Sequence, residues 1–340
     1  MSNRLSFKIS TTVFPDRFQR PRVADQARRG WRVAVLSWAA VVHACSPPPQ
    51  GPRAPEPTRP PPIGLAAMGE APEKFLGAYD GTGYRFLVGG HTYGRHDAPA
   101  EGLFEPLFRL WSRPEVREGA RFAVLCGDVV VNPHPNNFEE LDDDLAVLGL
   151  PVFLAPGNHD TLKPELPDVI TLRYGKRRLA FRYGPDAYLV GDTARGGGDL
   201  APEDLTDLKR LLLSRPRALF VFLHHLIWVD EGKVARGEVD ANAVNGLIGY
   251  AREGNFDDVV LPLLGEANTK AFVFAGDLGA GSGAVQTFET RGDNVTLVAG
   301  GMGEHSKVGV YHSVGVFSDG VEIEVVWLEG GKREKHWVEF

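Results

Sequence analysis

Short apolar runs alternate along most of this chain with longer stretches in which apolar residues recur at helical spacing. Short runs rich in Val, Phe and Leu are typical of buried strands, and they predict strands at about 84–88, 122–125, 151–155, 179–183, 187–190, 218–223, 271–274, 285–288, 295–299, 308–317 and 321–328. The helical spacing predicts helices at about 100–111, 138–148 and 202–214, with two more within 241–264. Strands that alternate with helices in this way predict an α/β fold.

The predicted strand at 151–155 ends in Pro156-Gly157, and three functional side chains follow directly. Asn158, His159 and Asp160 supply an amide, an imidazole and a carboxylate. Open α/β sheets place their sites at the carboxyl ends of strands, and these groups can bind a metal, donate a proton and orient the donor. The same tetrapeptide, Gly157–Asp160, also fits an ordinary turn, so the other strand ends bear on the choice.

Four more predicted strands end in a polar side chain, namely His91, Asp128, His224 and Asp277. Imidazoles, carboxylates and one amide that converge from five strands indicate a divalent-metal site. Each residue also has a plainer interpretation, since His91 and Asp277 could cap turns and Asp128 could cap the following segment.

The first 77 residues of the sequence have the features of an export signal and a spacer. Residues 1–32 are basic, an apolar run spans 33–42, and a small residue precedes Cys45. This order resembles a bacterial lipoprotein signal with Cys45 lipidated, although an ordinary cleaved signal or a buried strand also fits. Residues 46–77 are proline-rich and predict an extended linker. We therefore expect a signal at 1–45, a linker at 46–77 and a domain at 78–340, exported to the periplasm or outer surface.

Composition narrows the possible partners. Hydrophobic residues make up 43% and charged residues 24% of the chain, as in soluble globular proteins, and the net charge is −7. A negative chain is a poor electrostatic partner for nucleic acid. With only two cysteines, Cys45 and Cys126, a disulfide framework is not expected, and Cys126 is interpreted as a buried apolar residue. Membrane contact is expected only through a lipid anchor at Cys45.

The strand-end residues, in this order, resemble the motifs of the calcineurin-like metallophosphoesterase superfamily. Gly127-Asp128 and Gly157-Asn158-His159-Asp160 match two motifs as they stand, and Val221-Phe222-Leu223-His224 matches the form V-x-x-H. The resemblance covers about residues 80–330. It implies a four-layer α/β/β/α sandwich with two mixed β-sheets, and a phosphate ester, small or polymeric, as substrate.

Two motifs of the superfamily are degraded here. Gly89-Gly90-His91 stands where the superfamily has D-x-H, and Gly276-Asp277-Leu278-Gly279 stands where it has G-H-x-H. For one metal the resemblance leaves His91 and Asp128. For the other it leaves four donors, Asp128, Asn158, His224 and Asp277. The expected cofactor is therefore one divalent ion rather than two, with Mn, Fe or Mg favoured over Zn by the oxygen-rich set.

The resemblance also assigns roles in hydrolysis. His159 would protonate the leaving oxygen, Asp160 would orient His159, and His91 would lie in the pocket. His225 is interpreted as a packed or outer residue, because V-x-x-H selects His224 as the ligand. Two hypotheses follow, namely a weak metal-dependent phosphoesterase acting on phosphomonoesters or phosphodiesters, and a binding protein that kept the fold without catalysis.

Overall fold

The computed structural model describes residues 68, 71–95, 98–100, 102–161, 168–195, 197–229, 254–278, 286–302 and 309–340. All of them belong to one compact unit, Pro57–Phe340. The expected signal, Cys45, the first part of 241–264 and Gly279 lie outside the described residues.

Helices and strands alternate along the described chain, as the apolar pattern predicts. In chain order they are α1 (Glu73–Leu76), β1 (Tyr84–Gly90), β2 (Gly94–Arg95), β3 (Ala98–Pro99), α2 (Glu105–Trp111), α3 (Pro114–Arg117), β4 (Ala120–Cys126), α4 (Pro135–Leu148), β5 (Val152–Ala155), α5 (Val169–Tyr174), β6 (Leu179–Tyr183) and β7 (Asp186–Val190). They continue as α6 (Pro202–Leu213), β8 (Ala218–Leu223), the π-helical turn η3 (Phe256–Val260), α9 (Leu261–Gly265), β9 (Lys270–Ala275), β10 (Gln286–Arg291), β11 (Val295–Gly300), β12 (Val310–Val316), β13 (Gly320–Trp327) and β14 (Arg333–Glu339).

Two six-stranded mixed sheets form the centre of the unit. The first has the order β14-β13-β12-β1-β4-β5, and the second has the order β10-β11-β9-β8-β7-β6. In the first sheet β4 runs parallel to both β1 and β5. In the second sheet β7, β8, β9 and β11 are parallel neighbours. Because parallel strands end at the same edge of a sheet, their carboxyl ends place the following loops together.

The two sheets face each other across an aromatic core. The ring of Phe86 on β1 lies 5.2 Å from that of Phe220 and 5.8 Å from that of Phe222, both on β8. The alternate residues of β8, among them Leu219 and Val221, belong to a separate buried cluster with α6 and α9. This two-residue alternation explains why 218–223 is apolar throughout, since each face of β8 is covered.

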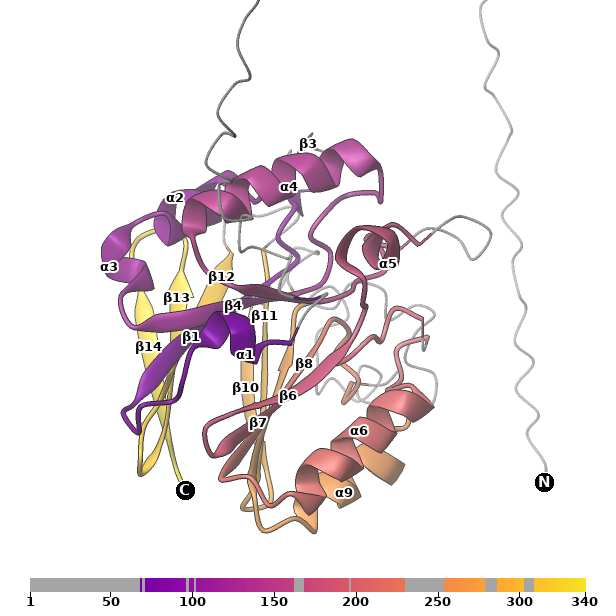
Figure 1. Ribbon diagram of the computed structural model, residues 1–340, viewed down its shortest axis with the longest axis vertical. Coiled ribbons are helices and arrows are strands. Elements are labelled where there is room, and N and C mark those ends of the chain that lie inside the picture. The colour runs from indigo at the N-terminus through magenta and orange to yellow at the C-terminus, as the bar shows by residue number, and fades with distance from the viewer. Residues whose placement is uncertain are drawn as a thin grey trace, which may run out of the picture. The chain divides into compact units, whose positions relative to one another are not determined.

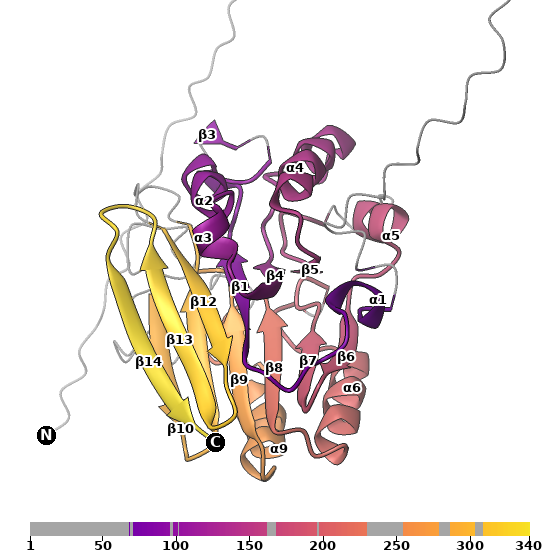
Figure 2. The same ribbon diagram turned by 60° about the vertical axis from the view of Figure 1, so that its left-hand side comes forward.

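Helices cover the outer face of each sheet (Figures 1 and 2). Phe138, Leu141, Leu145 and Leu148 of α4 are fully buried with the core of the first sheet. Leu208 and Leu211 of α6 are buried on the second sheet. The predicted four-layer α/β/β/α sandwich with two mixed sheets is therefore confirmed.

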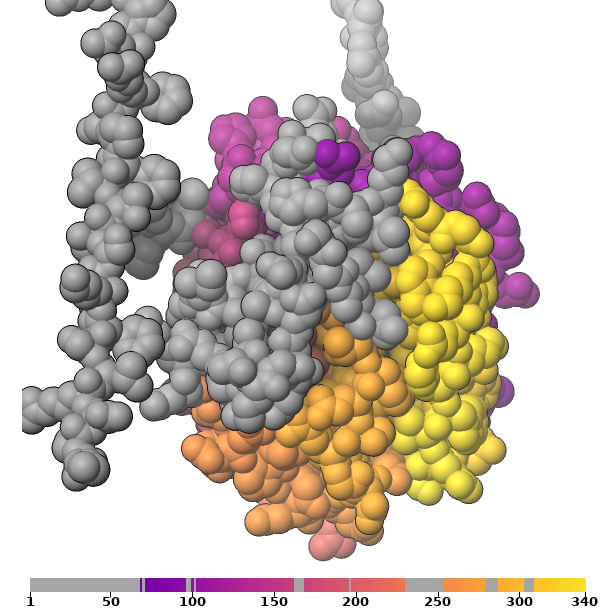
Figure 3. Space-filling model, turned by 180° about the vertical axis from the view of Figure 1, so that it is seen from behind, coloured from indigo at the N-terminus to yellow at the C-terminus, as the bar shows by residue number. Residues whose placement is uncertain are grey.

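The last strand, β14, was not predicted from the sequence. Its residues alternate between exposed and half-buried, and five of the seven are charged or histidine, so no apolar run marks it. It is an edge strand of the first sheet, and edge strands commonly carry charged side chains that discourage further pairing. His336 of β14 stacks on Phe288 of β10, with ring centroids 3.9 Å apart. Figure 3 shows the yellow C-terminal segment beside the orange segment that precedes it in the chain.

The packed core begins before residue 78, which was the expected start of the domain. Met68 is fully buried, and its sulfur accepts a hydrogen bond from the backbone N–H of Leu154 on β5 at 3.3 Å. Leu76 of α1 is only 4% exposed. The proline-rich pattern gave no sign of these contacts, because an isolated Met or Leu carries no periodicity.

A chain that starts at Ala78 is accordingly expected to be less stable than one that starts at Pro57. Full burial of a Met or Leu side chain stabilises a fold by about 1.5–3 kcal/mol, so loss of both side chains should cost about 3–6 kcal/mol. Urea unfolding of the two truncated chains measures the difference. Equal midpoints and slopes would show that Met68 and Leu76 contribute nothing.

His312 on β12 is a buried histidine that pairs with Val88 of β1. It is 2% exposed, its Nε2 has no hydrogen-bond partner within the described part of the chain, and its ring lies 6.1 Å from that of Phe274. Burial lowers the pKa of His312 to about 4 from an ordinary 6.5. The folded state therefore holds His312 neutral at a pH where the unfolded chain is protonated.

This depressed pKa predicts a loss of stability in acid that His312→Leu should reduce. Between pH 6.5 and 4 the His312 side chain binds a proton in the unfolded state but not in the folded state. The folded state is therefore not penalised by His312 above pH 6.5, and it loses stability as the pH falls below that value. At pH 4.5 the loss assigned to His312 is roughly 2–3 kcal/mol. Chemical unfolding at pH 7 and pH 4.5 tests it, with His134→Asn as the control at an exposed histidine. An unchanged acid loss in His312→Leu would contradict the assignment.

Candidate metal centre

The loops after five strands meet at one place because glycines let their backbones approach closely. A Cβ on Gly276 would lie 1.9 Å from the carbonyl oxygen of Cys126, and one on Gly90 would lie 2.2 Å from the Cα of Gly276. A Cβ on Gly157 would lie 2.2 Å from Oδ1 of Asp128. Any side chain at these positions would push the polar groups apart. The glycines beside the polar residues are thus part of the site's construction.

Two of the convergent residues have backbone conformations that L-residues seldom adopt. His91 has φ 51° and Asp128 has φ 50°, and both are fully buried. Such conformations cost of order 1–3 kcal/mol each and concentrate at functional sites, where the surrounding structure holds them in place.

His224 is at the centre of the cluster. Its Nδ1 is 3.1 Å from the carbonyl oxygen of Cys126, and its Nε2 is 2.9 Å from Oδ1 of Asn158. The same Nε2 is 3.4 Å from Oδ1 of Asp128 and 3.8 Å from Oδ2 of Asp277. Oxygens from three other loops therefore surround one imidazole nitrogen.

The protonation of His224 follows from these partners. A carbonyl only accepts, so Nδ1 carries the proton that it donates to Cys126. Burial lowers the pKa of His224 to about 4, so at neutral pH the ring is uncharged and Nε2 presents a lone pair. A lone pair turned toward three oxygen acceptors is unfavourable unless a cation lies among them. An Nδ1–H bound to a backbone carbonyl is also the usual arrangement of a histidine that ligates a metal through Nε2.

His91 lies on the other side of Asp128. Its Nε2 is 3.7 Å from Oδ2 of Asp128, and neither ring nitrogen has a hydrogen-bond partner among the described residues. Burial lowers the pKa of His91 to about 4, with the carboxylate of Asp128 acting in the opposite direction. A buried imidazole without hydrogen bonds is costly, and a metal ion would satisfy it. The two oxygens of Asp128 thus face two different histidines.

Asp277 is fixed beside His224 by the backbone. The N–H groups of Gly276 and Asp277 both donate to the carbonyl oxygen of His224, at 3.0 and 2.9 Å. Asp277 is 2% exposed. One ligand atom each of His224, His225 and Asp277 lies within 4.8 Å of the others, a spacing that could hold a metal ion.

His225 is closer to this group than the sequence indicated. Adjacent strand residues point to opposite faces, which would separate His225 from His224, but β8 has ended at Leu223 and both histidines lie in the following bend. Nδ1 of His225 is 2.9 Å from Oγ1 of Thr193, which also accepts the backbone N–H of His225 at 3.2 Å. The histidine doublet was the available signal, and Thr193 had none.

His159 is half-buried, whereas His91, His224 and His225 are buried. Its Nδ1 is 2.9 Å from the carbonyl oxygen of Val131, and its backbone N–H donates to Oδ1 of Asp128 at 3.0 Å. The ring of Tyr93 packs between His159, at a centroid distance of 5.3 Å, and His91, at 4.4 Å. The sequence pattern had not indicated Tyr93 or the carbonyl of Val131.

Asp160 ties two loops together. Its Oδ1 accepts the backbone N–H groups of Val129 at 2.8 Å and Val130 at 3.1 Å, and its Oδ2 accepts that of Gly157 at 2.8 Å. Burial raises the pKa of Asp160 to about 6, with Asp128 as a second cause. The resemblance assigned Asp160 to orienting His159, but the contact that orients the ring is the carbonyl of Val131. Asp160 positions the loops that carry Asp128 and His159.

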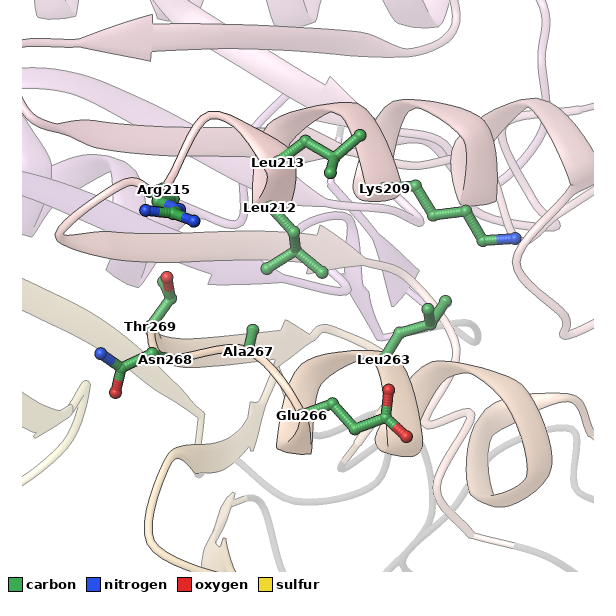
Figure 4. A pocket seen from close by; sticks show the side chains of 9 residues that line it. All are labelled: Lys209, Leu212, Leu213, Arg215, Leu263, Glu266, Ala267, Asn268 and Thr269. Carbon is green, nitrogen blue, oxygen red and sulfur yellow. The ribbon is translucent and has the colours of Figure 1, made fainter.

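The structure therefore brings together all the residues singled out in the sequence, which are His91, Asp128, Asn158, His159, Asp160, His224 and Asp277. A separate cavity of about 870 Å³ lies near the beginnings of β8 and β9, the opposite ends of these strands from His224 and Asp277. Figure 4 shows Leu212 of α6 and Leu263 of α9 facing this space, with Lys209 at its rim. Its lining is largely apolar and includes none of the convergent residues.

Comparison with known proteins supports the fold. No family model matches the sequence, and a search of curated proteins found no significant match. Among solved structures, a dimetal phosphatase from Danio rerio is similar with a TM-score of 0.51 at 12% identity, over 76% of this chain and 99% of that one. GAP50, the anchor in the inner membrane complex of Plasmodium, is similar with a TM-score of 0.51 at 12% identity, over 76% and 89% of the two chains.

The chain thus has the calcineurin-like metallophosphoesterase fold, as the motifs implied. The two sheets, their outer helices and the similarity to the dimetal phosphatase agree on this class. No helix in the described ranges is long and apolar enough to cross a bilayer.

Proposed function

We propose that this protein is a metal-dependent phosphoesterase that hydrolyses phosphomonoesters or phosphodiesters. The observation that carries the proposal is the position of Nε2 of His224, which lies 2.9, 3.4 and 3.8 Å from oxygens of Asn158, Asp128 and Asp277. The donor set fits a divalent cation, because it combines two carboxylates and an amide oxygen with one imidazole. Asp128, Asn158, His224 and Asp277 would hold one ion, and His91 and His225 lie directly beside them.

A bound divalent metal supplies a Lewis acid for phosphoryl oxygens and lowers the pKa of bound water. The chain contributes the remaining parts. Asp160 holds the Asp128 and Asn158 loops in register through three backbone amides. The closely packed glycines keep the donors from spreading apart, which favours preorganised charge stabilisation.

His159 is the residue placed to move a proton. Its Nδ1 is held by the carbonyl of Val131, so Nε2 is the atom that would transfer a proton to a leaving oxygen. Partial exposure lets His159 exchange protons with solvent, which the buried His91 and His224 do less easily. Proton donation of this kind contributes typically 10²–10⁴-fold to a rate.

The second candidate is a phosphoesterase-fold binding protein without catalysis. The degraded motifs Gly89-Gly90-His91 and Gly276-Asp277-Leu278 favour it, because they remove ligands that the superfamily uses. The similarity to GAP50, an anchor, gives a second reason to keep this candidate beside the dimetal phosphatase. Retention of His159 with a fixed ring orientation favours the enzyme, since a binding protein has no need of a proton donor.

Metal analysis separates the two candidates. The full chain, purified without chelator, should contain close to one equivalent of Mn, Fe or Mg, and should hydrolyse a panel of phosphate esters slowly with added Mn²⁺. His224→Ala should lose both the metal and the activity, whereas Lys209→Ala, at the distant cavity, should keep both. If the wild-type protein is purified without metal and hydrolyses no ester after loading with Mn, Fe, Mg or Zn, the enzyme candidate is excluded and the binding protein remains.

We also propose that the protein is exported and tethered through a lipid on Cys45, on the basis of the basic, apolar and small-residue order before that cysteine. Fractionation of cells that express wild type and Cys45→Ser tests this. Wild type should sediment with membranes and Cys45→Ser should be released. An equal distribution of the two proteins would exclude a lipid at Cys45.

A further inference from the structure

A second cavity, with a polar lining, lies on the loop that follows β7. It measures about 480 Å³, and its wall includes Lys176, Arg178, Asp192 and Asp204. Asp192 directly precedes Thr193, whose Oγ1 contacts both the backbone N–H and Nδ1 of His225. The loop after β7 thus lines the cavity and also contacts His225, which lies beside the candidate metal centre, and the cavity and the centre have no residue in common.

A buried ion network lines this cavity. Arg177, 7% exposed, donates to Asp192 from Nε and Nη2 at 2.5 and 3.2 Å, and from Nη1 to Asp168 at 2.8 Å. Asp168 also pairs with Arg195 at 2.9 Å. The charge of Arg177 is thus satisfied within the wall, so this arginine shapes the cavity rather than awaiting a ligand.

Three other residues of the wall, Lys176, Arg178 and Asp204, could contact a ligand. Asp204 is fully buried, and its Oδ2 accepts the backbone N–H of Asp192 at 3.2 Å, but its Oδ1 has no hydrogen-bond partner in the described parts of the chain. Lys176 is exposed at the cavity and forms no ion pair with any residue described. Arg178 adds a second cation, paired at 3.2 Å with the exposed Glu203. A buried carboxylate oxygen without a donor is costly, so the cavity favours a ligand that supplies one.

The cavity thus offers cations for an anionic group and a carboxylate oxygen for a hydrogen-bond donor. We propose that it binds a small phosphate ester whose alcohol part carries hydrogen-bond donors, with the phosphate on Lys176 and Arg178 and a donor on Asp204. Lys and Arg suit phosphate, and the volume is within the range of small-molecule sites. The choice of phosphate over another anion rests on the proposed phosphoesterase function. The preference for an anionic group does not depend on that function, because it follows from the charges of the wall.

Calorimetric titration of the metal-free full chain tests this site apart from catalysis. Glycerol 3-phosphate should bind, inorganic phosphate should bind more weakly, and glycerol should not bind measurably. Lys176→Ala and Arg178→Ala should each weaken the binding of glycerol 3-phosphate by about tenfold, because each removes one charge-assisted hydrogen bond. Asp204→Asn should weaken the binding of glycerol 3-phosphate but not that of inorganic phosphate. Lys209→Ala, which removes a lysine at the other cavity, should change neither.

Several results would overturn the proposal. Absence of binding would do so, as would binding that Lys176→Ala and Arg178→Ala leave unchanged, since the ligand would then lie elsewhere. If Asp204→Asn weakens the binding of phosphate and of glycerol 3-phosphate equally, Asp204 does not contact the alcohol part and the cavity is a simple anion site. Lys176 is exposed, so its variant should fold even if Asp204→Asn does not. Because the chain is metal-free, these outcomes are independent of whether the loaded protein hydrolyses esters.

Discussion

Asp277→Ala is expected to abolish metal binding and, with it, all phosphoesterase activity. Asp277 is 2% exposed, and its Oδ2 lies 3.8 Å from the same His224 nitrogen that faces Asn158 and Asp128. Its carboxylate and that of Asp128 together balance a divalent charge. Loss of an outer-shell partner already costs 10–100-fold in metal affinity, so loss of a direct ligand should cost more than about 100-fold.

The backbone at this position makes the substitution easy to interpret. Gly276 and Asp277 are held through their N–H groups, which an alanine retains, so the loop should keep its place. Metal content per chain, measured after dialysis against buffered Mn²⁺, gives the result, with Asp143→Ala on the exposed face of α4 as the carboxylate control. Asp277→His should shift preference toward zinc, which imidazole suits.

Equal metal in wild type and Asp277→Ala would make Asp277 a turn residue. If neither chain binds metal, either an amide N–H of Asn158 satisfies the lone pair on Nε2 of His224, or Nε2 itself carries the proton and donates it to Asn158. The binding-protein candidate would lead if neither chain binds metal. The measurement therefore decides between a ligand cluster and a hydrogen-bonded polar core.

The fold could be predicted from the sequence because its sheets are buried on both faces. A strand such as β8 is apolar at every position, with Phe220 and Phe222 in the inter-sheet core and Leu219 and Val221 under α6 and α9. Local pattern and tertiary burial agree there. They disagree at β14, whose outer face is solvated and whose pairing with β13 depends on long-range contacts that no local pattern encodes.

The membership of the site was predictable, but its contacts were not. Strand ends followed by Gly and a polar residue identified Asp128, Asn158 and Asp277, because close packing demands glycine beside each functional group. Partners that act through the backbone have no sequence signature. Val131 orients His159 through its backbone carbonyl, and Asp160 accepts hydrogen bonds from three backbone amides. Neither role could be predicted from the type of residue.

His159→Asn is expected to slow hydrolysis of esters with poor leaving groups by about 10²–10⁴-fold while the metal stays bound. His159 contacts the cluster through its backbone N–H, which donates to Asp128 in either variant, so the ligands should keep their positions. An asparagine side chain cannot supply a proton at neutral pH. An alkyl phosphate, whose leaving oxygen needs that proton, should therefore suffer far more than a nitrophenyl phosphate, whose anion leaves unaided.

The ratio of kcat for the two ester types is the informative quantity. It should rise strongly in His159→Asn in favour of the nitrophenyl ester and stay constant in His134→Asn, where the exposed histidine that precedes α4 is replaced. Metal content must be measured on the same samples. An equal fall for both esters at full metal occupancy would mean that His159 only shapes the pocket, and proton transfer to the leaving oxygen would then have to come from solvent. A fall that tracks metal loss would instead assign His159 to supporting Asp128 through the loop that Asp160 holds.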